Sequence, residues 1–293
     1  MAYDVPVTVI IFNRPEITKV LGDVIRQVSP DRLFIISDGA RKDHAGEEDK
    51  VNECRRIMED AGKDSEIIRC YSDENMGCDP RIVSGLDLVF SKVDRSIILE
   101  DDCIPDISFF RYCKELLERY EDDERVMYVS GSNRTHYKMK SSYSFSYEAS
   151  TWGWAAWSRS WKLYKDGKES WKQLRTKNDF KRYMNLISYR KYCKTLDIYN
   201  GWKDFPWDVA WQMQVMEHNG LGIVPCVNMI ENIGYGEDAT HTQTRSLLQE
   251  WPVSGMKFPM KRSEEIVQDK RYLAQKKRDR MYERMCSRFG RKS

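Results

Sequence analysis

Short apolar runs and amphipathic stretches alternate through the first hundred residues, and this alternation limits the possible folds more than any other feature of the sequence. Short apolar runs are typical of buried strands, and apolar residues at helical spacing are typical of amphipathic helices. Their alternation favours right-handed crossovers, so we predict an α/β fold with a mostly parallel sheet flanked by helices. The predicted strands are 5–12, 32–37, 65–70 and 96–99, and the predicted helices are 16–27, 47–61 and 79–90.

Polar side chains follow three of the predicted strands. Asn13 and Arg14 come after the first strand, Asp38 after the second, and the acidic triplet 100–102 (Glu-Asp-Asp) after the fourth. In open sheets of this kind, ligands bind beyond the carboxyl ends of the strands. We therefore expect these side chains to share one site.

The acidic triplet itself predicts a bound cation. Three adjacent carboxylates repel one another unless a positive charge lies near them. Mg2+ and Mn2+ prefer carboxylate oxygens and usually share a phosphate-bearing substrate, so the triplet predicts a metal that holds a diphosphate. The alternative is a solvated turn whose acids cap a helix that starts near Asp106.

The second half of the chain is rich in tryptophan and is predicted to be mainly helical. Eight of the nine tryptophans lie between Trp152 and Trp211. Several of them must belong to the core, although an indole ring also stacks well on the apolar face of a sugar. The predicted elements are helices at 179–184 and 189–199, a strand at 221–225, and a glycine-rich loop at 232–244.

The composition excludes two broad classes of protein. Hydrophobic residues make up 41% of the 293 residues, which is ample for a packed core and excludes wholesale disorder. The longest apolar runs are too short to cross a bilayer, and the N-terminus lacks the pattern of a secretory signal. The eight cysteines are scattered without a CxxC pair, which favours reduced thiols over a zinc site. We therefore expect a cytoplasmic protein.

Positive charge is concentrated at the C-terminal end, where a charged helix is predicted at 263–286. Residues 257–293 hold thirteen Lys or Arg and five Asp or Glu, a net charge of +8, whereas the whole chain has a net charge of +2. This imbalance indicates an anionic partner for the segment, such as the inner face of the plasma membrane. The alternatives are a solvated helix packed on the domain or on a second subunit. No aromatic and basic groove motif supports a nucleic acid.

The order of several motifs is more specific. ILEDDCIPDISFFRYC is followed by VMYVSGSN, YSFS, WGWAAWSRSW, WDVAW and NIGYGEDATHT. Together they resemble a bacterial branch of the glycosyltransferase family 2-like enzymes, which have the GT-A fold. They are more distantly similar to the animal N-acetylglucosaminyltransferase I family, which also has an EDD form of the Asp-x-Asp motif. The resemblance covers about residues 5–245 and implies a GT-A domain at 1–250, with a nucleotide-sugar-binding half (1–130), an acceptor half (131–250) and a basic extension at 251–293.

The resemblance also implies a role for individual residues. Asp102 would be the direct ligand of a Mn2+ or Mg2+ ion bound to the donor diphosphate, Asp101 would lie near the ribose, and Glu100 would fix the loop. Asp38 would read the nucleotide base, and Arg14 would lie at the nucleotide end of the site. The other donor-site residues implied in this way are Asn75, Gly77 and Arg81, although residues 75–77 also fit a turn before a helix.

Sugar transfer with inversion needs a carboxylate that removes the proton of the acceptor hydroxyl. The resemblance places this base at Asp208 in FPWDVAW, with Asp204 as the second choice, and an Asp that opens a helix also suits a capping role. We expect Trp152 or Trp154, together with Trp207, on the acceptor side. His241 in DATHTQT is a candidate second metal ligand or a residue that supports the ligands.

We therefore predict a metal-dependent glycosyltransferase that moves a hexosyl or N-acetylhexosaminyl group from a nucleotide-diphosphate sugar, UDP-linked by preference, to a glycan or glycolipid hydroxyl with inversion. One rival is a sugar nucleotidyltransferase, but such enzymes normally have a glycine-rich phosphate loop after the first strand. VTVIIFNRPEIT has no glycine there. The other rivals are a non-catalytic carbohydrate- or nucleotide-binding protein of the same fold and a hydrolase that uses two carboxylates.

Overall fold

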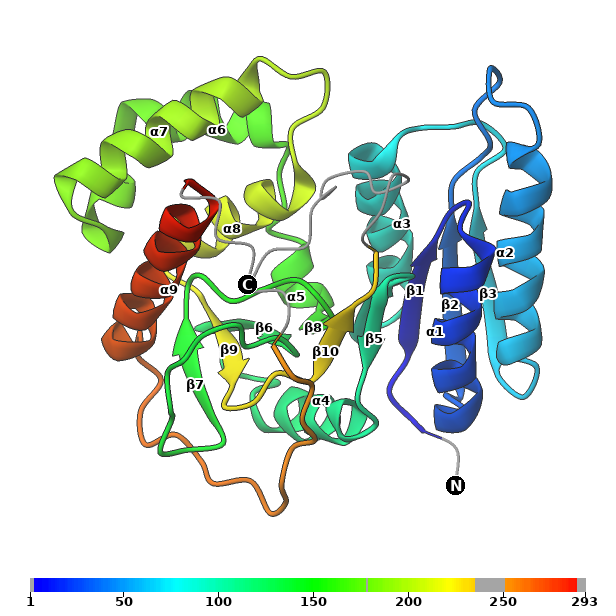
Figure 1. Ribbon diagram of the computed structural model, residues 1–293, viewed down its shortest axis with the longest axis horizontal. Helices are drawn as coiled ribbons and strands as arrows, with labels where there is room; N and C mark the ends of the chain where they lie inside the picture. Colours follow the sequence, from blue (N-terminus) through cyan, green and yellow to red (C-terminus); the bar gives the residue numbers. More distant parts are fainter. Residues whose placement is uncertain (1–2, 178, 235–250, 289–293) are drawn as a thin grey trace.

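The structure is a computed structural model that describes residues 3–177, 179–234 and 251–288. An eight-stranded mixed sheet with the order β3-β2-β1-β4-β8-β6-β9-β7 forms its centre, and a two-stranded sheet pairs β10 with β5 (Figure 1). The strands are β1 (Val7–Ile11), β2 (Arg32–Ser37), β3 (Glu66–Tyr71), β4 (Arg95–Glu100), β5 (Cys103–Pro105), β6 (Val126–Ser130), β7 (Tyr143–Ser146), β8 (Trp154–Trp157), β9 (Leu221–Pro225) and β10 (Ile230–Asn232).

The first half of the chain forms the parallel part of the large sheet. β1 pairs in parallel with both β2 and β4, and β2 pairs in parallel with β3. The connections are α1 (Pro15–Val28), α2 (Glu47–Ala61) and α3 (Cys78–Lys92). Pro15 opens α1, where its missing N–H costs nothing. The predicted α/β class, with a mostly parallel sheet flanked by helices, is confirmed.

The second half adds antiparallel strands that the sequence did not predict. β8 lies between β4 and β6 and is antiparallel to both, and β7 pairs antiparallel with β9. The helices here are α4 (Ser108–Arg119), α5 (Ser158–Trp161), α6 (Gly167–Lys177), α7 (Leu186–Asn200), α8 (Trp207–Glu217) and α9 (Lys270–Arg288). Residues Asp179–Tyr183 form a short 3-10 helix where a helix was predicted at 179–184. One predicted boundary was wrong, because the C-terminal helix begins at Lys270 rather than at 263.

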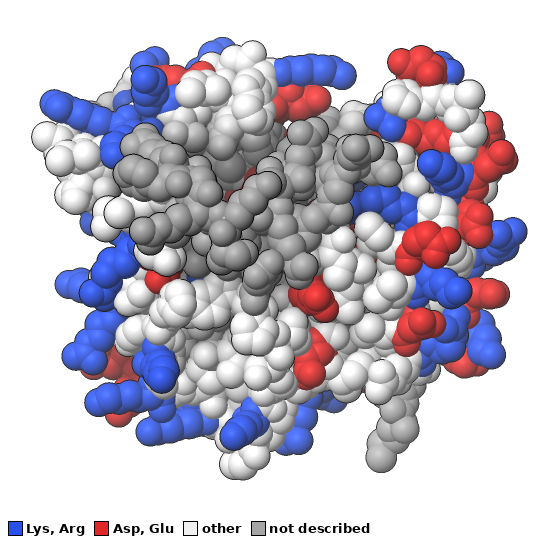
Figure 2. Space-filling model, viewed as in Figure 1, with Lys and Arg blue, Asp and Glu red and all other residues white. Residues whose placement is uncertain are grey.

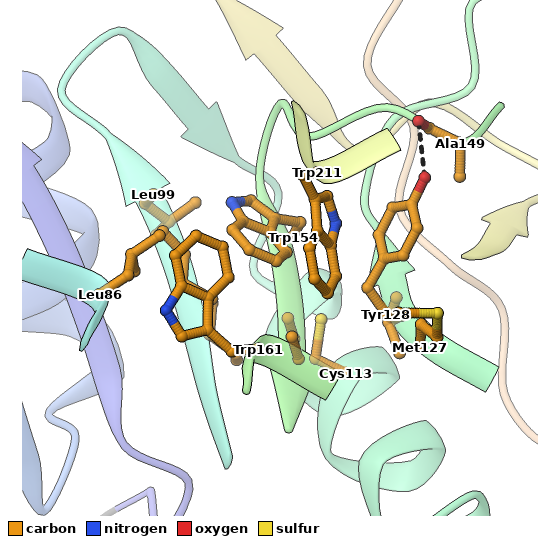
Figure 3. Packing of buried hydrophobic residues seen from close by; sticks show 14 of the residues in the cluster. Leu86, Leu99, Cys113, Met127, Tyr128, Ala149, Trp154, Trp161 and Trp211 are labelled. Atoms are coloured by element: carbon orange, nitrogen blue, oxygen red, sulfur yellow. Dashed lines mark hydrogen bonds between the residues drawn. The ribbon is translucent and has the colours of Figure 1, made fainter. Parts of the chain in front are cut away.

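Tryptophans of this half form the centre of the core (Figure 3). The ring of Trp154 on β8 lies 5.9 Å from that of Trp211 on α8 and 6.2 Å from that of Trp161 on α5. The hydroxyl of Tyr128 on β6 donates a hydrogen bond of 2.9 Å to the carbonyl of Ala149. Large aromatic rings from four elements thus join the strands to the helices that cover them.

The C-terminal segment packs on the domain. Gln268 forms a bridge with Phe145 of β7, and Tyr272 and Leu273 on α9 are buried. Further along the helix, Asp279 accepts hydrogen bonds from the backbone N–H of His136 and pairs with its ring. This contact agrees with the packed-helix alternative for the segment. Within the described ranges, no helix is both long and apolar enough to span a membrane.

Candidate functional site

A cavity of about 300 Å³ opens at the carboxyl ends of β1, β2 and β4. Every described residue that we predicted for the nucleotide or for the metal lies in its wall, and so does Trp152. The lining residues are Ile10, Ile11, Phe12, Asn13, Arg14, Asp38, Arg41, Asn75, Gly77, Cys78, Arg81, Ile82, Glu100, Asp101, Asp102, Trp152, Asn232 and Gly234. The ends of these strands therefore bring together predicted residues that are up to about ninety positions apart in the sequence.

Arg14 links the β1 end of the cavity to the acidic triplet at the end of β4. Its guanidinium donates to both carboxylate oxygens of Asp101, and it lies 3.2 Å from Oδ2 of Asp102. A two-point arginine–carboxylate pair fixes both side chains. Arg14 thereby neutralises one acid of the triplet and approaches a second.

The negative charge of the triplet is only partly compensated by Arg14. Burial and the charges of Asp102, Asp101 and Asp208 raise the pKa of Glu100 to about 8. Burial also raises the pKa of Asp101 to about 6, although the charge of Arg14 acts in the opposite direction. A further cation placed here would favour the ionised forms of these acids.

Asp38 fixes the loop that forms the next wall of the cavity. Its carboxylate accepts hydrogen bonds of 3.0–3.1 Å from the backbone N–H groups of Gly39, Met76 and Gly77. Asn75 of the same loop donates to the carbonyl of Gly39. Both carboxylate oxygens of Asp38 are thus used within the protein, and this acid shapes the loop that lines the β2 side of the cavity.

Arg81 on α3 also lines the cavity. Its guanidinium donates to the carbonyl of Cys70, at the end of β3, and to the hydroxyl of Ser84. Burial lowers the pKa of Arg81, although the charge of Asp38 opposes this effect. The side chain joins β3 to α3 and leaves a positive charge in the cavity wall.

Arg41 and Asn13 form one part of the cavity wall. Asn13 was predicted to lie at a strand end, but Arg41 was not predicted as a site residue. Both are held by the buried carboxylate of Glu47 at the start of α2, which accepts from Asn13 Nδ2 at 2.8 Å, from the backbone N–H of Arg41 at 2.7 Å and from its guanidinium. These bonds hold the pKa of Glu47 at about 2. Arg41 adds a second partly exposed cation to the β2 side of the cavity.

Asp102 faces the opposite wall, which β10 supplies. Its carboxylate lies 3.4 Å from Asn232 Nδ2, and its backbone carbonyl accepts from the N–H of Ile233. A Cβ at Gly234 would lie only 2.0 Å from Oδ2 of Asp102, so the chain can pass here only without a side chain. Neither Asn232 nor Gly234 was predicted as a site residue, because their contact with the triplet depends on the pairing of β10 with β5.

Asp208 lies in the first turn of α8 and does not itself line the cavity. The carboxylate of Asp79 accepts a hydrogen bond of 2.8 Å from the backbone N–H of Trp207 and so fixes the start of this helix. The side chain of Asp208 is exposed, and its charge acts on Glu100 and on Cys78, both of which line the cavity. The alternative base, Asp204, has a carboxylate oxygen 4.0 Å from the Cβ position of Gly77.

The three tryptophans predicted on the acceptor side have different environments. Trp152 lines the cavity, and the guanidinium of Arg134 lies 3.8 Å from its ring centroid. Trp154 is only 1% exposed and stacks on Trp207 at 5.8 Å, so the prediction for Trp154 was wrong: its ring is part of the core. Trp207 is also buried, and its contribution to the site is the backbone bond to Asp79.

The chemistry of the donor set fits Mg2+ or Mn2+. The cavity offers hard carboxylate oxygens with incompletely compensated charge, and Asp102 contributes one of them where the backbone of Gly234 approaches it closely. Among the described residues no group of three protein ligands is assembled, so most of the coordination would come from a phosphate-bearing ligand and from water. The predicted second ligand, His241, lies outside the described residues.

No protein-family model matches the sequence, and no curated protein matches it. Solved structures that resemble the chain include a mannosyltransferase from Pyrobaculum calidifontis in complex with GDP-Man and Mn2+, at 18% identity over 44% of this chain and 35% of that one, with a TM-score of 0.31. The matched part is thus about a third of that protein.

Two further structural neighbours are nucleotidyltransferases in the wide sense. The 4-diphosphocytidyl-2C-methyl-D-erythritol synthase from Anaerococcus prevotii is 11% identical over 55% of this chain and 73% of that one, with a TM-score of 0.36. An apo UDP-glucose pyrophosphorylase is 6% identical over 75% of this chain and 90% of that one, also with a TM-score of 0.36. Likenesses as distant as these do not distinguish one activity from another.

Proposed function

We propose that this chain is a metal-dependent glycosyltransferase that moves a sugar from a nucleotide-diphosphate sugar to a hydroxyl of a glycan or glycolipid. The observation that carries the proposal is the meeting of the acidic triplet, Arg14 and Asp38 in one cavity at the strand ends, with Asp208 close enough for its charge to act on Glu100. Acids in the cavity wall can hold a cation against a diphosphate, while the carboxylate of Asp208 can take the proton of an acceptor hydroxyl.

In the proposed reaction, the carboxylate of Asp208 takes the proton of the acceptor hydroxyl. The hydroxyl oxygen forms a bond to the anomeric carbon from the face opposite the diphosphate. The bond from that carbon to the diphosphate oxygen breaks, its electron pair leaves with the nucleoside diphosphate, and the anomeric centre is inverted. Asp79 supports this role, because its bond to the N–H of Trp207 fixes the turn that carries Asp208.

The metal in this proposal is Mn2+ or Mg2+. Asp102 would hold it together with oxygens of the donor diphosphate and water, and the ion would supply charge neutralisation for the leaving group. Arg14 keeps Asp101 in place and adds a fixed positive charge beside the same phosphates. Trp152 is the tryptophan that we propose for contact with the acceptor, because it was predicted on the acceptor side and it lines the cavity.

The connection between β1 and α1 favours sugar transfer over nucleotidyl transfer. Only Phe12, Asn13 and Arg14 lie between Ile11 and Pro15, and none of them is a glycine. A loop of this kind does not wrap a triphosphate with backbone N–H groups in the way that a glycine-rich loop does.

We propose UDP as the donor nucleotide and the cytoplasm as the place of the reaction. The seven cysteines whose side chains the structure describes are all free thiols, which suits a reducing compartment. The basic C-terminal segment would bring the enzyme to an anionic membrane where glycolipid acceptors lie.

Calorimetric titration with UDP, GDP, CDP and dTDP, each with and without Mn2+, tests the donor site. We expect one nucleotide to bind only with Mn2+, with affinity lost at least about tenfold in Asp102→Ala. Asp49→Ala, which removes an exposed acid on α2 outside the cavity, should bind as the wild type does. Failure of all four nucleotides to bind would overturn the proposal.

A donor-turnover assay with the sugar nucleotide chosen in this way tests the base. Asp208→Asn should keep nucleotide affinity and lose about 10²- to 10⁴-fold in transfer rate. Asp204→Asn is the matched variant four residues earlier, and its rate decides between the two acids. Unchanged turnover in Asp208→Asn would overturn the assignment of the base, and free sugar formed without any acceptor would show a hydrolase.

A further inference from the structure

Exposed apolar side chains gather on two helices at the side of the molecule far from α1 and α2. Thirteen large hydrophobic side chains of the described residues are exposed, and seven of them lie on α7, on the turn after it, or on α9. Six of the seven are more than half exposed, which is unusual for large apolar side chains in contact with water. These six are Leu186, Ile187, Ile198, Met281, Tyr282 and Met285.

The same two helices carry exposed positive charge. Figure 2 shows Lys and Arg along the edge where α7 and α9 lie, whereas many of the visible Asp and Glu lie on the side of α1 and α2. Asp197 on α7 pairs with Arg175, and the neighbouring Glu148 pairs with Lys276 and Arg280. Among the side chains that the structure describes, the exposed cations of the two helices are Arg190, Lys191 and Lys194 on α7 and Lys270, Arg271, Lys277, Arg278 and Arg280 on α9.

On each helix the apolar and basic side chains share one stripe. Ile187, Lys191, Lys194 and Ile198 are spaced by three or four residues and so lie on one face of α7. Lys277, Met281 and Met285 do the same on α9. We call these seven residues the α7–α9 face.

The two stripes border one groove. Lys191 on α7 and Lys277, Arg280 and Met281 on α9 line the same cavity of about 520 Å³, whose floor includes Met216 of α8. The two helices are therefore neighbours across a shared depression, with Lys191 of one stripe and Lys277 and Met281 of the other in its wall.

We infer that the α7–α9 face is a docking surface for an anionic lipid bilayer. Charge complementarity selects an anionic partner, because the α7–α9 face holds three lysines and no acid, and Asp197 of α7 is paired with Arg175. The exposed Ile and Met side chains select a partner with an apolar interior, since a polar polyanion gives them nothing to bury in. A second copy of this chain would bring two equally basic faces together, and their repulsion disfavours that contact.

This inference extends beyond the basic C-terminal segment, because half of the face comes from α7. It does not depend on sugar transfer. Membrane docking through this face would hold α7 and α9 at the headgroup level, with the α1–α2 side of the molecule pointing away from the bilayer (Figure 1).

Vesicle flotation of the full chain tests the inference without any nucleotide or acceptor. Vesicles of phosphatidylcholine mixed with phosphatidylglycerol should bind the protein at low salt, and pure phosphatidylcholine vesicles should bind it at least about tenfold more weakly. The double variant Lys191→Glu and Lys277→Glu should lose binding by about tenfold or more. The matched pair Lys19→Glu and Lys50→Glu, exposed on α1 and α2, should bind as the wild type does.

A second pair of variants tests the apolar part of the face. Ile187→Ser with Met281→Ser should weaken binding to the mixed vesicles several-fold at constant charge, whereas Val20→Ser on α1 should not. Nucleotide affinity, measured on the same variants, should be unchanged, which separates this inference from the proposed glycosyltransferase. Absence of binding to mixed vesicles would overturn the inference. So would equal losses in the control variants, or a wild-type dimer that the Ser variants convert to monomer.

Discussion

Glu47 shows how one buried carboxylate outside the cavity sets the positions of side chains inside it. It accepts hydrogen bonds from Asn13 and Arg41, which come from two different connections of the sheet and both line the cavity. Its pKa is held at about 2, well below its usual value of 4.5, and bonding to Arg41 is the largest cause. Glu47 is therefore a positioning residue for the part of the cavity wall that Asn13 and Arg41 form.

We expect Glu47→Gln to lower the free energy of unfolding by about 1–2 kcal/mol at pH 7, because a charge-assisted set of hydrogen bonds is lost. The folded-state pKa lies below the unfolded one, so the contribution is present above pH 4.5 and is lost as the pH falls toward 2. Urea unfolding measures the free energy of unfolding of the wild type and of the variant. The difference between the two should shrink as the pH falls from 5 to 3.

Glu48→Gln is the matched control, because Glu48 is the exposed neighbour on the same turn of α2. Its unfolding free energy should stay within about 0.5 kcal/mol of the wild type at both pH values. A constant, pH-independent difference for Glu47→Gln would show that the carboxylate does not act through its charge.

Gly234 is the second residue-scale case. An alanine Cβ there would meet Oδ2, Cβ and Cγ of Asp102 at 2.0–2.7 Å, so Asp102 would have to move. We expect Gly234→Ala to weaken Mn2+-dependent nucleotide binding by about tenfold or more, since a displacement of this size misplaces the ligand. Titration of Gly22→Ala, whose new Cβ meets only ordinary contacts at 3.5 Å, should give wild-type affinity; equal affinities for both variants would exclude Asp102 from the site.

At the scale of elements, two glycines in helices differ in the space that a side chain would find. A Cβ at Gly22 of α1 would fit at 3.5 Å from Ala61 and Ile57, whereas a Cβ at Gly85 of α3 would meet Ile36 of β2 at 2.7 Å. Gly22→Ala should therefore raise the free energy of unfolding by about 0.5–1 kcal/mol through helix propensity. Gly85→Ala should lower it by about 1–3 kcal/mol through overpacking. Chemical unfolding of both variants checks the prediction, and the same sign for both would contradict the packing described for α3 and β2.

Elements of the first half were predictable because each has a local signal. The apolar run of β1, the Pro15 that opens α1 and the charged stripe of α2 are all readable from neighbouring residues. In the second half, β8 is a four-residue WAAW strand whose position between β4 and β6 depends on long-range pairing. Its tryptophans fit helix, strand or ligand site equally well by local pattern, so burial of Trp154 could be decided only by the packed core.

The residues of the site also divide into those that a local sequence signal predicts and those that depend on long-range contacts. Arg14, Asp38 and the acidic triplet follow strands, so the topology rule alone placed them together. Arg41, Asn232 and Gly234 enter the cavity through contacts between elements that have no spacing signature in the sequence. The weak signals that existed were the Asn two residues before a glycine in the 232–244 loop and the lone Arg three residues after Asp38.

At the scale of the whole molecule, residues 251–293 bear on how the chain divides into folding units. The predicted division sets them apart from a domain at 1–250. The structure buries four large side chains of this segment against the rest of the chain, namely Met256, Met260, Tyr272 and Leu273. Asp279 and Lys276 also bond to residues of the first unit, at His136 and Glu148.

We therefore expect a chain that ends at residue 250 to lack a cooperative unfolding transition. Burial of each large apolar side chain is worth about 1.5–3 kcal/mol, so four of them contribute about 6–12 kcal/mol as an upper estimate. That is comparable to the whole stability of a typical domain, about 5–15 kcal/mol. Calorimetry of the truncated and full chains checks this, with Tyr272→Ala as a milder buried change and Met281→Ala as the exposed control on the same helix. If the truncated chain unfolds at the temperature of the full one, residues 251–293 are an independent extension, and the buried contacts of α9 add nothing to the stability of the fold.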